Sequence, residues 1–170
     1  YLLIVILFVV VVLVLLVNTK KGDRKTLPPA FDKTAFNYLP TSTTGQIVQH
    51  THFTLSYSEA NEQAEWVAYQ LIRDDLQNVA ERGDNFREDP KIVSGSASPD
   101  DYRRSGYDRG HLAPAGDMGF SEAAMSECFF MSNISPQDRA FNRGIWRTLE
   151  GQTRSWVAEN GSLYVVTGGV

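Results

Sequence analysis

The sequence predicts an α+β domain, because strand-like and helix-like patterns of apolar residues alternate along most of the chain. Residues 47–57 alternate polar side chains with apolar ones, as in a half-buried strand, the apolar set being Phe53, Leu55 and Tyr57. Residues 163–169 (LYVVTGG) read as a second, buried strand, whereas residues 140–156 carry apolar side chains at helical spacing. The composition, 42% hydrophobic and 21% charged, is that of a globular protein.

The N-terminal segment predicts a membrane anchor. Residues 1–17 (YLLIVILFVVVVLVLLV) are one unbroken apolar run, roughly 26 Å long as a helix, close to the thickness of the hydrocarbon core. The run passes into Asn-Thr-Lys-Lys without a small-residue cleavage site, which favours a retained anchor over a removed signal peptide. We therefore expect a transmembrane segment at residues 1–17, a linker at 18–45 and a folded domain at 46–170.

A helix is predicted after the first strand. Ser58 is a good N-cap, and the apolar residues that follow have helical spacing: Ala64, Val67, Ala68, Leu71 and Ile72. This pattern favours an amphipathic helix packed on the core by one face. Residues 81–106 are charged and contain Gly and Pro, so we expect them to be mostly loop.

Residues 107–150 are predicted to run strand, loop, short helix, strand and helix. The first strand spans residues 108–111, Ser121 caps the short helix, and the apolar residues 128–132 form the second strand. The helix at residues 140–156 has Ile145, Trp146 and Leu149 on its apolar face. Because the chain stops just after the strand at residues 163–169, we expect the domain to be incomplete at its C-terminus.

Three motifs hold the side chains that a metal-assisted phosphodiester hydrolase needs. They are DRGHLAP (108–114), MSNISPQ (131–137) and FNRGIWRTLE (141–150). The reaction needs an activated water, a counter to charge on the phosphate oxygens and stabilisation of the leaving alkoxide. His111 suits the first task, because an imidazole accepts a proton from water near neutral pH. Arg109, two residues earlier on the strand, points to the same face and can fork onto a phosphate.

Together these motifs resemble the DNA/RNA non-specific endonucleases, the ββα-metal nucleases. Residues 65–69 (EWVAY) also resemble the first helix of that family, so the resemblance runs from about residue 41 to residue 170. It implies a ββα-metal finger at residues 107–150, packed on a central, mainly antiparallel sheet with flanking helices. It also implies a sugar-non-specific endonuclease that cleaves DNA and RNA with little sequence selectivity, since its contacts are to phosphate and metal rather than to base edges.

The resemblance implies a role for each matching residue. Asn142 would be the direct protein ligand of a divalent cation, usually Mg²⁺, with Mn²⁺ or another divalent cation as the alternative. Glu150, eight residues further along the helix, would hold metal-bound water and so belong to both the metal and the catalytic set. Asn133 would support the histidine site and complete the catalytic set with His111 and Arg109. A sparse ligand set suits Mg²⁺, which keeps several of its waters.

Further arginines are expected to bind substrate phosphates. The family has a phosphate-clamping arginine upstream of the motifs. Either Arg82 or Arg87 could be that arginine. Arg143 stands where many relatives carry glutamine, so it either adds phosphate affinity or lies in solvent. Arg139, Arg143 and Arg147 recur every four residues and would form a basic stripe on a helix, although a solvated helix face has the same spacing. The net charge of −4 does not itself favour nucleic acid.

Other sites have weaker support in the sequence. Cys128 could act as a nucleophile with His111, but the apolar residues after it favour a buried thiol. His50 and His52 could bind zinc, but no suitable third ligand stands nearby in the sequence. Asp117 is expected in a turn.

Two other functions stay open beside the nuclease. One is a nucleic-acid-binding module without turnover, whose signature would be the loss of His111 or Asn142; both residues are present. The other is a phosphodiesterase for small or lipid-linked diesters, which a membrane anchor makes conceivable. A nuclease would attack the nucleic acid of its own cell, so we expect a membrane-anchored domain exported to the periplasm or the outer surface. The basic residues after the anchor would instead favour a cytoplasmic domain.

Overall fold

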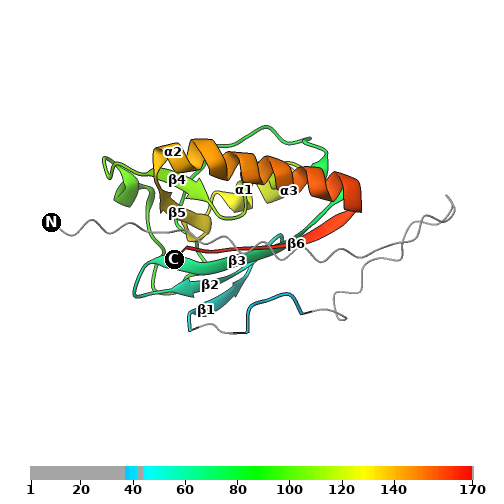
Figure 1. Ribbon diagram of the computed structural model, residues 1–170. Helices are drawn as coiled ribbons and strands as arrows, with labels where there is room; N and C mark the ends of the chain where they lie inside the picture. The colour runs from blue at the N-terminus through cyan, green and yellow to red at the C-terminus, as the bar shows by residue number, and fades with distance from the viewer. Residues whose placement is uncertain (1–36, 42–43, 170) are drawn as a thin grey trace, which may run out of the picture.

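Sheet and helices form two layers. The computed structural model describes residues 37–41 and 44–169. In Figure 1 a four-stranded antiparallel sheet forms the lower layer, and the helices lie above it with a two-stranded ribbon. This arrangement confirms the predicted α+β class with an antiparallel sheet. The anchor predicted at residues 1–17 and most of the linker predicted at 18–45 lie outside the described residues. Within the described part, no helix is long and apolar enough to cross a membrane.

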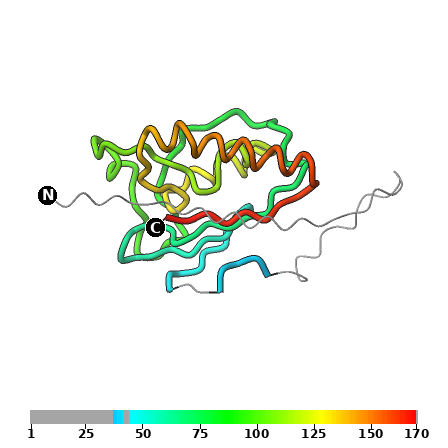
Figure 2. The backbone as a smooth tube through the Cα atoms, viewed as in Figure 1, coloured from blue at the N-terminus to red at the C-terminus, as the bar shows by residue number. Residues whose placement is uncertain are grey.

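The sheet has the strand order β1-β2-β3-β6, and every neighbouring pair is antiparallel. β6 buries every second side chain and pairs with β3, which confirms the strand predicted near the C-terminus. Figure 2 shows this last strand, in red, running back beneath the long helix. The four strands are β1 (Gln46–Gln49), β2 (Thr54–Ser58), β3 (Gln63–Ile72) and β6 (Ser162–Thr167).

The strand predicted at residues 47–57 is in fact a hairpin. β1 and β2 pair with each other, and the chain turns between them, where the His50 amide donates to the Phe53 carbonyl at 2.9 Å. Leu55 and Tyr57 are buried in β2 as predicted, Phe53 is buried just before the strand, and Ser56 between them is buried as well. The turn was missed because it contains neither Gly nor Pro, the residues that usually mark one.

The helix predicted after Ser58 is wrong, because those residues form the ten-residue strand β3. β3 lies between β2 and β6 and buries side chains on both of its faces, for example Trp66 on one and Val67 on the other. A strand buried on both sides need not alternate, so its apolar residues can match helical spacing by chance. The expectation that residues 65–69 match the first helix of the family is therefore also wrong.

The upper layer carries the three motifs. β4 (Asp108–His111) and β5 (Ile134–Gln137) pair as an antiparallel ribbon, with the short helix α1 (Glu122–Cys128) between them in the chain. The Ser121 hydroxyl accepts from the Ala124 amide at 3.1 Å and caps α1, as predicted. The strand predicted at residues 128–132 is wrong: α1 extends to Cys128 and a short 3₁₀ turn follows. A short apolar run does not distinguish a buried strand from a buried helix.

The last helix is interrupted just where the third motif begins. It consists of α2 (Arg139–Phe141), one wide turn at Asn142–Trp146 and α3 (Arg147–Asn160). The wide turn shifts the helical register relative to the uninterrupted helix predicted at residues 140–156. As a result Trp146 is buried, whereas Ile145, which was predicted on the same apolar face, is 65% exposed.

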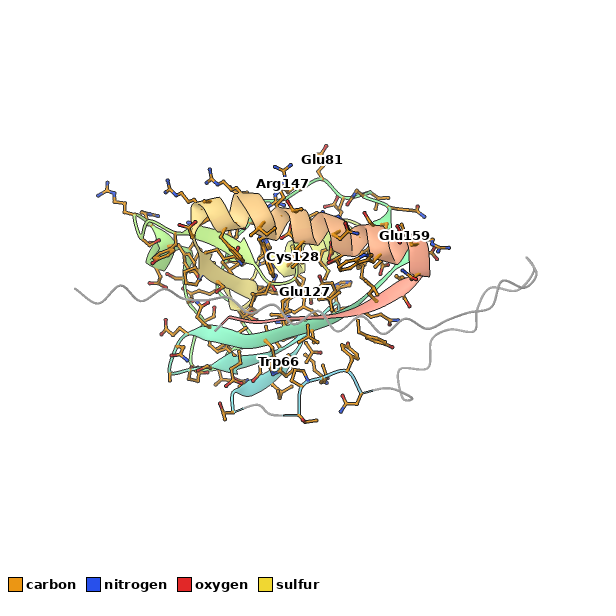
Figure 3. The ribbon with its side chains drawn as sticks, in the orientation of Figure 1. Trp66, Glu81, Glu127, Cys128, Arg147 and Glu159 are labelled. Atoms are coloured by element: carbon orange, nitrogen blue, oxygen red, sulfur yellow. The ribbon has the colours of Figure 1, made fainter. Side chains whose placement is uncertain are left out.

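The main core lies between the two layers. β3 directs Val67, Tyr69 and Leu71 toward the upper layer, where they join side chains such as Leu112 and Phe129. Figure 3 shows Cys128 on the helical side of the sheet and Trp66 at the opposite side. The core therefore fixes the ribbon and α1 rigidly on the sheet.

Candidate active site

A glycine lets β4 and β5 approach closely. A Cβ atom placed on Gly110 would lie 2.0 Å from Cδ of Gln137, whose side chain is buried. Only a residue without a side chain fits at this position of the DRGH motif. The close ribbon holds Arg109 and His111, two residues apart on β4, in fixed positions.

His111 is buried and kept neutral. Its ring packs on the rings of Phe86 and Phe129, with centroid separations of 5.6 and 4.9 Å. Burial, together with the nearby charge of Arg82, lowers the pKa of His111 to about 3. The Nε2 atom is buried, and no described residue forms a hydrogen bond with it. The imidazole is therefore unprotonated near neutral pH in the metal-free protein, although so low a pKa also makes it a weaker base than a free imidazole.

Asn133 joins the segment that follows His111 to the C-terminal end of α1. Its Nδ2 atom donates to the carbonyls of Ala113 at 3.0 Å and Cys128 at 2.8 Å, and its Oδ1 atom accepts from the Ala113 amide at 2.9 Å. The side chain is fully buried, so these bonds are shielded from water. Asn133 thus fixes the chain after β4 against the end of α1.

Arg109, Asn142 and Arg143 line one open hollow of about 430 Å³. We call it the β4 hollow, and its walls are Phe86, Tyr102, Tyr107, Asp108, Arg109, Asn142 and Arg143. The Arg109 guanidinium lies 5.0 Å from the centre of the Phe86 ring and donates to the Pro99 carbonyl at 3.0 Å. Because the same Phe86 ring touches His111, the histidine lies beside this hollow.

Asp108 organises the polar wall of the β4 hollow. Its Oδ2 atom accepts from Nδ2 of Asn142 at 3.2 Å and from Nε of Arg143 at 2.7 Å. A second bond from Arg143 at 2.9 Å makes this pair bidentate, and these bonds hold the pKa of Asp108 below its usual range. The bond from its amide nitrogen to Asp108 therefore fixes the orientation of the Asn142 side chain. Sequence reasoning missed Asp108, although it stands directly before Arg109.

The predicted arginine stripe is only partly a free surface. Arg143 is bound to Asp108, and Arg139 lies 3.6 Å from the same carboxylate. Arg147 is exposed on α3. The stripe therefore combines ion pairs at its start with an exposed cation at its end.

Glu150 lies apart from the β4 hollow. It lines a smaller hollow of about 20 Å³ with residues that include Tyr69, Asp117 and Trp146, which we call the Glu150 hollow. Burial, together with the neighbouring charge of Asp117, raises the pKa of Glu150 to about 7, although nearby arginines oppose the rise. Trp146, in the wall of this hollow, donates from its Nε1 atom to the His111 carbonyl at 3.3 Å.

Asp117 is more than the turn residue that the sequence predicts. It is buried, and its oxygens accept from the Tyr69 hydroxyl at 2.7 Å and from Nη1 of Arg154 at 2.6 Å. Burial nevertheless raises the pKa of Asp117. This cluster behind Glu150 was missed because Tyr69 was assigned to a helix, and only the true strand brings it to Asp117.

The geometry separates the two upstream arginines. Arg87 stacks on Phe130 at 4.0 Å and donates to the Ser126 carbonyl at 2.9 Å, so it holds α1 in place. Arg82 is exposed and approaches the Phe129 ring at 5.8 Å. Its charge acts on both His111 and Glu150. Arg82 therefore lies closer to the predicted catalytic groups.

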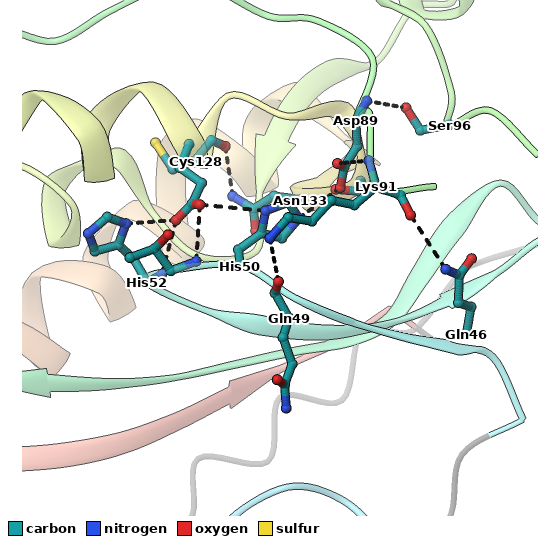
Figure 4. A network of polar contacts seen from close by, with 12 residues as sticks. Gln46, Gln49, His50, His52, Asp89, Lys91, Ser96, Cys128 and Asn133 are labelled. Carbon is teal, nitrogen blue, oxygen red and sulfur yellow. Dashed lines mark hydrogen bonds and ion pairs between the residues drawn. The ribbon is translucent and has the colours of Figure 1, made fainter. Parts of the chain in front are cut away.

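His50 and His52 each bind a carboxylate from the upper layer. His50 Nε2 lies 2.8 Å from Oδ2 of Asp89, and His52 Nδ1 lies 2.7 Å from Oε2 of Glu127, as Figure 4 shows in part. Burial opposes the charge on both carboxylates, but these bonds and others outweigh it, and the pKa values of Asp89 and Glu127 lie below their usual range. Among the described residues, no group of three or more His, Cys, Asp or Glu side chains is placed to hold a metal.

Cys128 is a buried thiol, as predicted. Its Sγ atom donates to the Met125 carbonyl at 3.1 Å, and burial raises the pKa of the thiol to about 12. A thiol in this state is a poor nucleophile, because the thiolate is the reactive form.

Comparisons with known proteins agree with this geometry. The family model for DNA/RNA non-specific endonuclease matches residues 32–170. The mitochondrial Nuclease EXOG of Danio rerio is 40% identical over 121 residues, covering 70% of this chain and 35% of the relative. A Nuclease of Nostoc sp. is 41% identical and covers 68% of this chain and 43% of the relative. Human mitochondrial Endonuclease G is 36% identical and covers 72% of this chain and 42% of the relative.

A solved structure resembles the fold as well. The crystal structure of an EndoG/EndoGI complex matches with a TM-score of 0.68 and 34% identity, covering 74% of this chain and 53% of that one. The chain spans 35% to 43% of the length of the three relatives described above. Because the family model matches far more than half of its residues, the chain belongs to the DNA/RNA non-specific endonuclease family.

Proposed function

We propose that this chain carries the catalytic centre of a metal-dependent endonuclease that hydrolyses phosphodiester bonds of DNA and RNA. The observation that carries the proposal is the buried, neutral His111 beside the β4 hollow, where Arg109 and Asn142 form part of one wall. Family membership supports the reaction class. The enzyme does not need to recognise the sugar or the base, because the side chains in this wall are of the kind that bind a phosphate and a cation.

His111 would act as the general base. Its neutral imidazole accepts a proton from the attacking water, and its fixed position limits the directions from which that water can approach. Asn133 would be a positioning residue, because its hydrogen bonds join the chain just after His111, at Ala113, to the end of α1, at Cys128.

Arginines would bind the phosphate. Arg109 lies in the β4 hollow and presents planar donors that match two phosphate oxygens. Arg82 is the upstream arginine that we assign to the same task, since Arg87 is committed to α1. Arg143 would add to the positive charge of the rim, although its bidentate bond to Asp108 already occupies it.

The residues present fit a hydrated Mg²⁺, with Mn²⁺ or a similar cation as the alternative. Asn142 offers an amide oxygen whose geometry is fixed by Asp108, and Glu150 offers a half-buried carboxylate that can hold water. Hard oxygen donors of this kind are those that Mg²⁺ prefers. When bound, the cation would supply charge stabilisation for the phosphate and the leaving oxygen.

We further propose that residues 1–17 anchor the protein in a membrane, with residues 18–45 as linker and 46–170 as the nuclease domain, exported to the periplasm or the outer surface. The apolar run supports the anchor, and the hazard of a nuclease inside its own cell supports export.

A nicking assay tests the proposed reaction. The full chain, purified in detergent, is incubated with supercoiled plasmid and with RNA, in Mg²⁺ or in EDTA. We expect metal-dependent cleavage of both, and a loss of about 10²-fold or more in His111→Ala, as is usual when a general base is removed. His52→Asn is the matched histidine control, because an amide nitrogen can replace Nδ1 toward Glu127 and cleavage should persist.

The assay also separates the other functions. Binding of DNA without cleavage by a folded, metal-loaded protein would indicate a binding module. Turnover of a small chromogenic diester alone would indicate a phosphodiesterase for small or lipid-linked substrates. Either result would reject the nuclease.

A further inference from the structure

One large aromatic side chain of the β4 hollow has no role in the chemistry above. Tyr107 lines the hollow and is 51% exposed. Its backbone is held in place, because the Tyr107 amide donates to the Ser105 hydroxyl at 3.1 Å and that hydroxyl donates to the Tyr102 carbonyl at 2.9 Å. Within the described residues, no side chain stacks on its ring or bonds its hydroxyl. An exposed ring on a fixed backbone is available to stack on a bound ligand.

The other two rings of this hollow are already engaged. Phe86 is covered by the Arg109 guanidinium and packs on His111. Tyr102 is only 8% exposed and donates from its hydroxyl to the Ile134 carbonyl at 3.1 Å. Tyr107 therefore supplies the accessible aromatic face of the wall that also carries Arg109.

The spacing of Tyr107 and Arg109 suits a nucleotide. Tyr107 directly precedes β4 and Arg109 is the second residue of that strand, so their Cα atoms lie within about 7 Å of each other, and both side chains line the hollow. A phosphate held by Arg109 brings its nucleoside to the neighbouring wall. The hollow, at about 430 Å³, falls within the range of roughly 300 to 1,000 Å³ that small-ligand sites occupy.

We propose that Tyr107 forms a base-stacking subsite for an unpaired nucleobase beside the cleaved phosphate, so that the enzyme favours single-stranded nucleic acid over duplex. This inference rests on the proposed nuclease function. In a duplex both faces of every base are covered by its neighbours, so the Tyr107 ring can reach only a sugar or a base edge. An unpaired base can stack on the ring whatever its sequence, which contributes about 1–3 kcal/mol per base.

Steady-state kinetics test the preference. A single-stranded oligonucleotide is compared with a hairpin duplex of the same sequence, for the full chain and for Tyr107→Ala and Tyr107→Phe. For the single strand we expect KM to rise by about 5- to 100-fold in the alanine variant, with kcat within about 2-fold, and the phenylalanine variant to behave as the parent does. For the duplex we expect KM to change by less than about 2-fold. Ile145→Ala is the control, an exposed apolar side chain outside the hollow.

A binding measurement separates this inference from the nuclease itself. Fluorescence anisotropy in EDTA compares a labelled single-stranded oligonucleotide with one of equal length that has abasic sites. The proposal requires Tyr107→Ala to weaken binding of the first by about 5-fold or more and of the second hardly at all. Equal weakening of both, or of neither, overturns the stacking subsite. If nothing is cleaved in the kinetic assay, the nuclease proposal fails while this comparison still decides the stacking.

Discussion

His111 and Glu150 owe their protonation states to the same cause. Burial penalises the charged form of each, so it lowers the pKa of the histidine to about 3 and raises that of the glutamate to about 7. Both groups are therefore mainly neutral at slightly acidic pH in the metal-free protein. Asp108 and Asp117 are each paired with an arginine, so the region carries little unpaired negative charge, which leaves it receptive to an anionic phosphate.

The glutamate should make stability depend on pH. The folded pKa of Glu150 lies above the unfolded value, so its neutral form stabilises the fold below about pH 4.5, and this contribution is lost as pH rises through about 7. Glu150→Gln keeps a neutral side chain at every pH. We expect urea unfolding in EDTA to show the variant more stable than the parent at pH 8, by on the order of 1 kcal/mol after allowance for solvent screening. At pH 4 the two proteins should unfold alike.

Glu159→Gln is the control for this comparison, because Glu159 is exposed on the same helix. It should show no such change between the two pH values. A stability gain of Glu150→Gln that is the same at pH 4 and pH 8 would contradict the raised pKa.

Single residues were predictable where a motif fixes their chemistry. The DRGH motif pointed to His111 and Arg109 from the sequence, and the structure places them side by side on β4. Their assigned roles stay predictions. Asp108 belongs to the same motif, yet its partnership with Asn142 and Arg143 depends on a helix that starts thirty residues later. Such a contact is set by packing and leaves no local pattern.

At the scale of elements, β3 shows why periodicity alone misleads. Its ten residues carry apolar side chains on both faces, since it is a central strand with a layer above it. β6 buries alternate side chains, whereas β2 was found because apolar and polar residue types alternate along it, although Leu55, Ser56 and Tyr57 are all buried. The wide turn at Asn142–Trp146 left no signal in the sequence either, although it decides that Trp146 rather than Ile145 is buried.

The β4–β5 ribbon should not tolerate a side chain at Gly110. In Gly110→Ala the new Cβ would overlap the buried Gln137, so we expect a loss of about 1–3 kcal/mol in the free energy of unfolding. Gly110→Ala combined with Gln137→Ala removes the overlapping atoms. Chemical denaturation should then show a double variant less destabilised than the sum of the two single variants. If the losses of the two single variants simply add in the double variant, the close approach of Gln137 is not the reason for a glycine at position 110.

At the scale of the whole molecule, contacts between histidines and carboxylates join the layers. His50 and His52 belong to the turn between β1 and β2, whereas Glu127 and Asp89 come from the upper part of the fold. The backbone amides of Thr51 and His52 also donate to Glu127, at 3.0 Å each. The hairpin turn is therefore fastened to α1, the helix that precedes Phe129 and the histidine pocket.

The location of the domain is a prediction at this scale. Reporter fusions placed after Gly45 compare a reporter that works only after export with one that works only in the cytoplasm. We expect activity from the exported reporter, and its loss when residues 1–17 are deleted, since the apolar run would direct insertion. Activity of the cytoplasmic reporter on the intact fusion would refute export and favour the orientation suggested by the basic flank.

The burial of Cys128 affects how the fold responds to oxidising and reducing conditions. It is the single cysteine of the sequence, it lies inside the core, and its thiol remains protonated at physiological pH. The described fold is thus held together without a disulfide and offers oxidants no thiolate to attack. Reducing agents have no cross-link to break, and peroxide finds no reactive sulfur at this position. The same folded structure can persist on either side of a membrane, whatever the redox potential there.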